Sequence, residues 1–167
     1  MKPNEIDAIM IHVSGTKFGE NVKAADIDRY HKQKGWKMIG YNYVIDLDGT
    51  VEKGRPVTMD GAHCNLPGFS GKSYNKHAIS ICIIGGLDAN GKEADTRTDA
   101  QKIALSKLIY DELLPEYPGI TDILGHRDAS PDLNGDGIIN KYEYVKSCPC
   151  FSVRDEFPIA ICVAERK

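Results

Sequence analysis

The stretch Ile6-Asp7-Ala8-Ile9-Met10-Ile11-His12-Val13 is a short apolar run that predicts a buried β-strand with a histidine at its far end. Residues 78–84, Ala-Ile-Ser-Ile-Cys-Ile-Ile, form the most apolar run of the chain and predict a second strand, which ends at Gly85-Gly86. These two strands are expected to form the centre of the fold.

Helix and hairpin signals fill the chain between these runs. Residues 24–34 carry spaced apolar and aromatic positions and stop at a glycine, which predicts a short amphipathic helix. Residues 41–47 predict a strand, Asp48-Gly49 is a strong hairpin signal, and residues 50–53 predict the return strand. Residues 58–77 show little periodicity and predict a long surface loop, of a kind that is often functional.

The second half of the chain contains the longest predicted helix. It begins at Thr98, which forms a capping box with Gln101 ahead of a mostly one-sided apolar stripe. Pro115 and Pro118 are expected to stop this helix. Residues 122–125 then predict a last short strand that leads into a histidine.

This order of elements predicts an α/β fold, with a central mixed β-sheet flanked by helices. The length of 167 residues and a hydrophobic content of 41% fit one domain, over residues 1–167, with a real core. The tail, residues 154–167, is expected to be either a closing strand through residues 159–163 or a loose end.

Composition excludes several classes of protein. A net charge of -3 and a pI near 5.9 argue against a dedicated nucleic-acid binder. No run is long enough for a transmembrane helix, so no membrane insertion is expected. The first five residues lack the apolar stretch of a signal peptide, which predicts synthesis in the cytoplasm.

Five cysteines, an odd number, do not indicate a disulfide framework, and Cys64 and Cys82 are expected to be buried thiols.

Two histidines and a cysteine are candidate metal ligands. His12 and His126 both follow short apolar strands, so both are expected at one edge of the sheet. Cys148 stands before a proline, which restricts its backbone to extended conformations and favours a thiolate that points inward. Three such ligands are the number in a catalytic zinc site, which keeps a fourth position open for water. Cys150 is an alternative to Cys148 as the third ligand.

A series of short motifs runs in one order from about residue 6 to residue 153. They are Ile-Met-Ile-His-Val-Ser (9–14), Trp-Lys-Met-Ile-Gly-Tyr-Asn-Tyr-Val-Ile (36–45), Asp-Gly-Thr-Val (48–51), Gly-Arg-Pro (54–56), Gly-Ala-His-Cys (61–64), Tyr-Asn (74–75) with residues 78–86, Gly-His-Arg-Asp (125–128), Cys-Pro (148–149) and Phe-Ser-Val (151–153). In this combination the chain resembles the zinc-dependent N-acetylmuramoyl-L-alanine amidases, the group that contains the small phage lysozyme-type amidases and the peptidoglycan recognition proteins.

The resemblance implies that His12, His126 and Cys148 bind zinc, and that Tyr41 and Lys146 are the two catalytic side chains. In the phage-type enzymes a tyrosine follows the glycine of a Gly-Tyr motif, and a lysine stands two residues before the ligand cysteine. Both positions match here. The implied reaction is hydrolysis of the amide bond between N-acetylmuramic acid and L-alanine in peptidoglycan.

Other residues of the long loop have weaker expected roles. His63 is expected to line the substrate groove, and Asn75, His77 and Ser80 lie where such enzymes contact the peptide stem. His31 and His77 are otherwise expected at the surface.

Residues 132–143 match the twelve-residue pattern of a calcium-binding loop. The expected ligands are Asp132, Asn134, Asp136, Ile138 through its backbone carbonyl, and Glu143, with a glycine at the sixth position for the sharp turn. Calcium is therefore a second candidate cofactor beside zinc, and it would rigidify the insert between the second and third zinc ligands. The alternative is a surface turn rich in Asp, Asn and Gly.

Two functions compete with the enzyme. One is a peptidoglycan-binding module without catalysis, but the presence of Tyr41, Lys146 and Cys148 favours catalysis. The other is a calcium-binding regulatory protein, which leaves the matches at His12 and His126 unexplained.

The expected partner is peptidoglycan or its muropeptide fragments, and the expected state is a monomer. The expected setting is an endolysin-like enzyme that lyses the cell wall after release through a membrane pore. A cytoplasmic muropeptide-recycling amidase, or export by a route that needs no signal peptide, are the alternatives.

Overall fold

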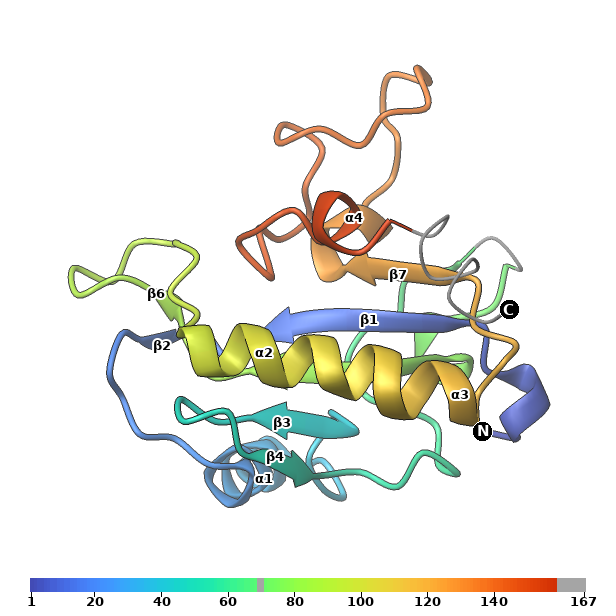
Figure 1. Cartoon of the computed structure of the whole chain (residues 1–167). Coiled ribbons are helices and arrows are strands. Elements are labelled where there is room, and N and C mark those ends of the chain that lie inside the picture. The colour runs from blue at the N-terminus through green and yellow to red at the C-terminus, as the bar shows by residue number, and fades with distance from the viewer. Residues whose placement is uncertain (69–70, 159–167) are drawn as a thin grey trace.

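A mixed five-stranded sheet with the order β4-β3-β5-β1-β7 forms the centre of the computed structural model, which describes residues 1–68 and 71–158 (Figure 1). The strands are β1 (Ala8–Val13), β3 (Tyr43–Ile45), β4 (Val51–Lys53), β5 (Ala78–Ile83) and β7 (Asp122–Gly125). Only the predicted hairpin β3–β4 is antiparallel, and the other neighbours run parallel. The α/β fold with a central mixed sheet is thus confirmed.

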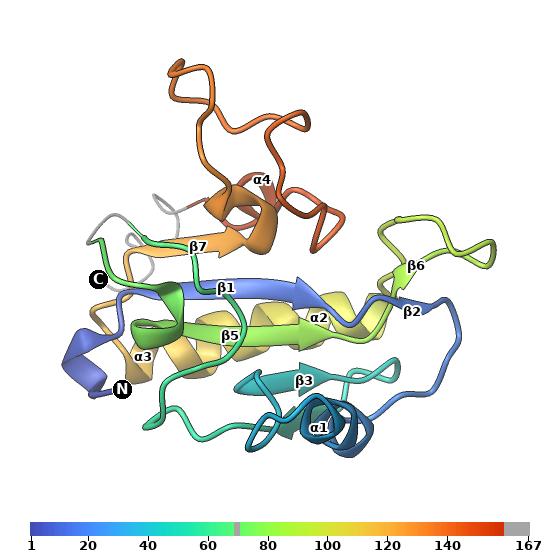
Figure 2. The ribbon, with the colours of Figure 1, turned by 180° about the vertical axis from the view of Figure 1, so that it is seen from behind.

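The two faces of the sheet are covered by different parts of the chain. Side chains alternate along a strand, so Ile9 and Ile11 of β1 face one side, while Met10 and His12 face the other. The first side packs against the long helix, α2 (Asp99–Lys107), which lies in front of the sheet in Figure 1. The other side packs against α1 (Ala24–Gln33) and the long loop, which lie in front in Figure 2.

The long helix is anchored at its start as the sequence predicts. Thr98 Oγ1 accepts a hydrogen bond from the Gln101 backbone (3.1 Å), and Gln101 Oε1 accepts one from the Thr98 backbone (3.0 Å). The amide of Gln101 also donates to the carbonyl oxygens of Ile45 and Ile84, at 3.2 and 2.9 Å. The helix is therefore tied directly to the ends of β3 and β5.

The helix ends between the two prolines that were expected to stop it. After α2 the chain continues as a π-helical segment, η3 (Leu108–Leu113), and a final turn, α3 (Leu114–Glu116). Pro115 therefore lies inside a continuous helical path, which ends one residue later at Glu116 and before Pro118.

Several short elements gave no signal in the sequence. They are the two-residue strands β2 (Thr16–Lys17) and β6 (Gly86–Leu87), which pair with each other, the 3-10 turns η1 (Pro3–Glu5), η2 (Tyr74–Lys76) and η4 (His126–Ala129), and the helix α4 (Val153–Glu156). None of them carries the apolar run or the hairpin signal by which β3, β4 and β7 were predicted. The alternative of a closing strand at residues 159–163 lies outside the described residues. Within the described part of the chain, no helix has the length and apolarity that a bilayer span requires.

Candidate metal centre and active site

His12 and His126 lie side by side because their strands are parallel neighbours. His12 is the fifth residue of β1, and its side chain is almost fully buried. His126 directly follows β7, whose pairing with β1 is in register from Ala8 opposite Asp122 to Ile11 opposite Gly125. The centroids of the two imidazole rings are 4.7 Å apart. Both histidines are thus at the same edge of the sheet.

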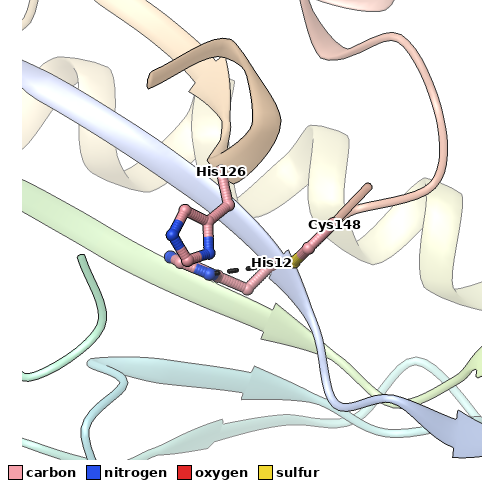
Figure 3. A group of neighbouring side chains, drawn as sticks. All are labelled: His12, His126 and Cys148. Atoms are coloured by element: carbon pink, nitrogen blue, oxygen red, sulfur yellow. Dashed lines mark hydrogen bonds between the residues drawn. The ribbon is translucent and has the colours of Figure 1, made fainter. Parts of the chain in front are cut away.

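Cys148 joins this pair from a distant part of the chain. Its Sγ accepts a hydrogen bond from the backbone N–H of Val13 (3.2 Å) and lies 3.9 Å from Nδ1 of His12. One donor atom from each of His12, His126 and Cys148 lies within 4.8 Å of the others (Figure 3). Small rotations of the side chains would bring such atoms within reach of one ion. Two imidazoles and a thiolate are ligands that zinc prefers.

Cys150, the alternative ligand, points elsewhere. Its Sγ lies 3.6 Å from the carbonyl oxygen of Gly86 in β6, and its backbone is left-handed, with φ of 71°. It is not part of the three-residue cluster found among the described residues. The geometry therefore favours Cys148 as the third ligand.

Burial controls the protonation of the cluster. The pKa of His12 is well below its usual value because of burial and the neighbouring His63, and burial together with the charge of Lys146 lowers the pKa of His126 to about 4. Both imidazoles are therefore neutral at pH 7, as metal ligands must be. Burial raises the pKa of Cys148 to about 12. A bound cation would reverse this effect, because a coordinating thiol is deprotonated.

Tyr41 and Lys146 both lie beside the cluster. The ring centroid of Tyr41 is 5.1 Å from that of His12, and burial raises the pKa of the phenol well above its usual value. The phenol thus keeps its proton and can donate a hydrogen bond. Lys146 is exposed, and its positive charge contributes to the lowered pKa of both His12 and His126. A neutral hydrogen-bond donor and a cation therefore line the same groove as the cluster.

These side chains lie in a groove with a volume of about 920 Å³. One wall comes from α1 and the residues after it, including Tyr30, Lys34 and Trp36. The opposite wall comes from Lys141, inside the calcium-loop-like segment, and from residues 144–148, which follow that segment. The groove is large enough for an extended ligand, and the metal cluster forms part of its lining.

The model of the N-acetylmuramoyl-L-alanine amidase family matches residues 2–149. The chain belongs to this family. It is 34% identical over 148 residues to the endolysin of Escherichia phage T7, a match that covers 89% of this chain and 83% of the endolysin.

The solved structures agree with the fold of this amidase. The N-acetylmuramoyl-L-alanine amidase LysC from Clostridium intestinale matches with a TM-score of 0.64 at 28% identity, covering 99% of this chain and 88% of that chain. A variant of Drosophila PGRP-LB in complex with tracheal cytotoxin matches with a TM-score of 0.62 at 21% identity, over 91% of this chain and 79% of that chain.

Two histidines of the amidase lie in places that differ from expectation. His31 is buried, not at the surface, because its Nδ1 accepts a hydrogen bond from the Gly40 backbone (3.0 Å) and its ring lies against Trp36. His77 is also buried, and its Nδ1 lies 2.5 Å from a carboxylate oxygen of Asp7. Each histidine has a polar partner that offsets the cost of burial.

The residues expected near the peptide stem form hydrogen bonds within the fold. The side-chain oxygen of Asn75 accepts hydrogen bonds from the backbone N–H groups of His63 and Cys64, at 2.7 and 2.9 Å. Ser80 is fully buried and bonds to Asn42. Asn75, His77 and Ser80 are all outside the groove lining, whereas His63 is part of it. Cys64 and Cys82 are buried thiols, as predicted.

The calcium-loop-like insert folds around its own acidic side chains. The carboxylate of Asp132 accepts from the backbones of Gly135 (2.7 Å) and Gly137 (2.8 Å). Glu143 is buried, and it accepts from the backbones of Leu133 and Asn140, both at 2.9 Å. The insert thus closes on itself.

The two ends of the insert are joined where it meets the body of the amidase. The backbone N–H of Val145 donates to the hydroxyl oxygen of Ser130 (2.9 Å). The chain therefore returns to the site with Lys146 and Cys148 in place, even though the insert itself projects away from the sheet (orange in Figure 1).

Proposed function

We propose that this amidase hydrolyses the amide bond between N-acetylmuramic acid and L-alanine in peptidoglycan, with zinc held by His12, His126 and Cys148. The observation that carries the proposal is the convergence of these three side chains in the groove beside Tyr41 and Lys146. The family match and the relationship to an endolysin support the same reaction.

The donor set fits a catalytic zinc site. Three protein ligands leave a fourth position for water, and the cluster lies in an open groove that a substrate can enter. When bound, zinc lowers the pKa of its water from about 15.7 toward 7 and polarises a carbonyl oxygen. The remaining catalytic work falls to side chains of the chain itself.

Lys146 is placed to stabilise negative charge on the substrate. Lys146 lines the same groove as the cluster, and its positive charge contributes to the lowered pKa of both histidines. A cation in the groove lining would stabilise the oxyanion that forms when the amide carbon of the substrate becomes tetrahedral.

Tyr41 acts as a hydrogen-bond donor. Because burial raises its pKa, the phenol is protonated at neutral pH, and its O–H can hold the attacking water or donate to the oxyanion.

Calcium in the insert is a further part of the proposal. The proposed ligands are Asp132, Asn134, Asp136, the carbonyl of Ile138, and Glu143. The twelve-residue spacing supports this assignment, as does the left-handed backbone of Gly137 at the sixth position, with φ of 81°. Bound calcium would stiffen the wall of the groove that carries Lys146.

The proposed biological role is endolysin-like lysis of the cell wall. It rests on the relationship to the phage endolysin and on the groove, which suits an extended glycopeptide. Synthesis in the cytoplasm and release through a membrane pore would bring the enzyme to the wall. A cytoplasmic amidase that recycles muropeptides would show the reverse preference, for soluble fragments over intact sacculi.

The first experiment measures zinc content together with the release of new L-alanine amino termini from purified sacculi. Wild type is expected to hold one equivalent of zinc and to release stem peptides, and Cys148→Ala is expected to lose both. Cys150→Ala is the matched control, because its thiol lies outside the cluster, and it should keep both. Zinc-free wild type that still cleaves would contradict the zinc assignment, and binding without cleavage would indicate a recognition module.

A further inference from the structure

We propose that His63 is a positioning residue for His12: it accepts a hydrogen bond from the ring nitrogen of His12 that faces away from the metal, and so fixes the orientation and tautomer of that ligand. This inference rests on the proposed zinc site. His63 also lines the groove, as expected from the sequence.

The geometry distinguishes the two nitrogens of His12. Nδ1 lies 3.9 Å from Sγ of Cys148, on the side where the three donor atoms gather. Nε2 lies on the other side of the ring, 3.1 Å from Nδ1 of His63. Nδ1 is therefore the metal-facing atom, and Nε2 is free to interact with His63.

The position of the proton follows from this arrangement. A metal-bound imidazole nitrogen carries no proton, so a neutral His12 ligated through Nδ1 has its proton on Nε2. That N–H donates to Nδ1 of His63, which must then be unprotonated. The proton of neutral His63 consequently lies on its own Nε2. The opposite pattern, with His63 donating, would place the proton of His12 on the atom that must bind the metal.

His63 is itself held rigidly from behind. Its backbone N–H donates to Oδ1 of Asn75 (2.7 Å), and the next residue, Cys64, donates to the same oxygen. Gly61 lies so close that a Cβ added there would be 2.6 Å from the His63 ring. The backbone of His63 is thus held by Asn75 and its ring is closely packed, which restricts the positions of the side chain, as a group that orients a ligand requires.

This assignment also explains the role of Asn75. Asn75 is not part of the groove lining, and its side-chain oxygen accepts from the backbone N–H groups of His63 and Cys64. Asn75 thus holds the loop that carries His63, and His63 in turn orients the ring of His12. Removal of a residue that hydrogen-bonds to a metal ligand typically lowers metal affinity by about 10-fold to 100-fold.

The test compares two substitutions of nearly equal bulk. In His63→Asn the amide oxygen occupies the position of Nδ1 and can still accept the hydrogen bond, whereas in His63→Leu no acceptor remains. Zinc affinity of the metal-free proteins is measured by competition with a chromophoric chelator, and thermal melting of the same samples checks that each variant is folded. His77→Asn is the control, because His77 is a buried histidine that pairs with Asp7 away from the site.

We expect His63→Leu to weaken zinc binding by about 10-fold to 100-fold, and His63→Asn to recover most of that loss. Wild-type affinity in a folded His63→Leu protein would overturn the inference. So would an Asn variant as weak as the Leu variant. Zinc binding that is absent from wild type would instead refute the proposed metal site.

A second measurement uses the wild-type protein alone and needs no folded variant. Nitrogen-15 NMR of the zinc-loaded wild type reports the tautomer of each histidine. A proton on Nε2 of His12, with an unprotonated Nδ1 on His63, is the expected result. A proton on Nδ1 of His63 in the zinc-loaded protein would refute the assignment, even if zinc binding itself were confirmed.

Discussion

The backbone N–H of Arg127 donates a 2.7 Å hydrogen bond to the carbonyl oxygen of Cys148. Arg127 directly follows the candidate ligand His126, and Cys148 is the candidate ligand 22 positions after His126. The bond therefore connects the chain segments of two candidate ligands. The N–H of Val13, directly after His12, bonds to the sulfur of the same cysteine. Main-chain groups thus hold the three ligand segments together.

Lys146→Ala is expected to lower turnover by about 100-fold to 1,000-fold, because it removes the proposed charge stabilisation of the oxyanion. Zinc content should stay at the wild-type level, since the amine is not a ligand. Lys141→Ala, which removes a second lysine from the same wall of the groove, is the control. Equal losses in both variants would show that the general charge of the wall matters rather than this amine.

Tyr41→Phe removes only the hydroxyl and keeps the ring that packs beside His12. We expect a large fall in kcat with little change in zinc affinity or melting temperature, because the hydroxyl is a proposed donor rather than a ligand. Steady-state kinetics on soluble muropeptides separate kcat from KM. Unchanged kcat would leave Tyr41 as a packing residue.

Gly125→Ala tests the close packing behind the ligands. A Cβ at this position would lie 2.5 Å from Cδ of Pro149 and 3.2 Å from a methyl group of Val153. The displaced proline would move Cys148, so both stability and zinc affinity should fall, stability by about 1 to 3 kcal/mol. Chemical denaturation and chelator competition measure the two effects. A stable variant with normal zinc affinity would show that this segment can shift freely.

Asp136→Ala tests calcium binding in the insert. Millimolar calcium is expected to raise the melting temperature of wild type but not that of the variant, because ligands that bind only the folded state stabilise it. Asp88→Ala is the matched control, since Asp88 also accepts backbone hydrogen bonds in an exposed turn and should leave the calcium response intact. Absence of a response in wild type would favour a plain surface turn.

The stability of the fold should decrease on acidification, partly through His31. Burial, and secondly the charge of Lys34, lower the pKa of His31 in the folded state. Below about pH 6.5 the unfolded chain therefore binds more protons at this residue, and unfolding becomes more favourable as the pH falls. His31→Asn should show a smaller loss of stability between pH 7 and pH 5 in urea titrations. Identical pH slopes would contradict this contribution.

The sequence predicted the parts of the site that depend on local pattern. Apolar runs located β1, β5 and β7, and parallel pairing then placed His12 and His126 at one edge of the sheet. The burial of His31 and His77 was not predictable in this way. Their partners, the backbone of Gly40 and the side chain of Asp7, are brought to them only by the tertiary fold.

The choice between Cys148 and Cys150 shows the same limit. Both cysteines flank one proline, and both are compatible with a ligand by residue type and spacing. Only the three-dimensional path of the chain directs one sulfur to His12 and the other to the carbonyl of Gly86. The role of Asn75 depends likewise on how the long loop folds back on itself.

The hydrogen bond between Val145 and Ser130 gives the insert a property of its own. The two ends of the insert meet at this bond. The insert can therefore become shorter, longer or different in sequence without changing the distance between Ser130 and Val145. The segment is thus a natural place for variation in length during evolution. For protein engineering it is an attachment point where a foreign sensor peptide would lie within reach of the substrate.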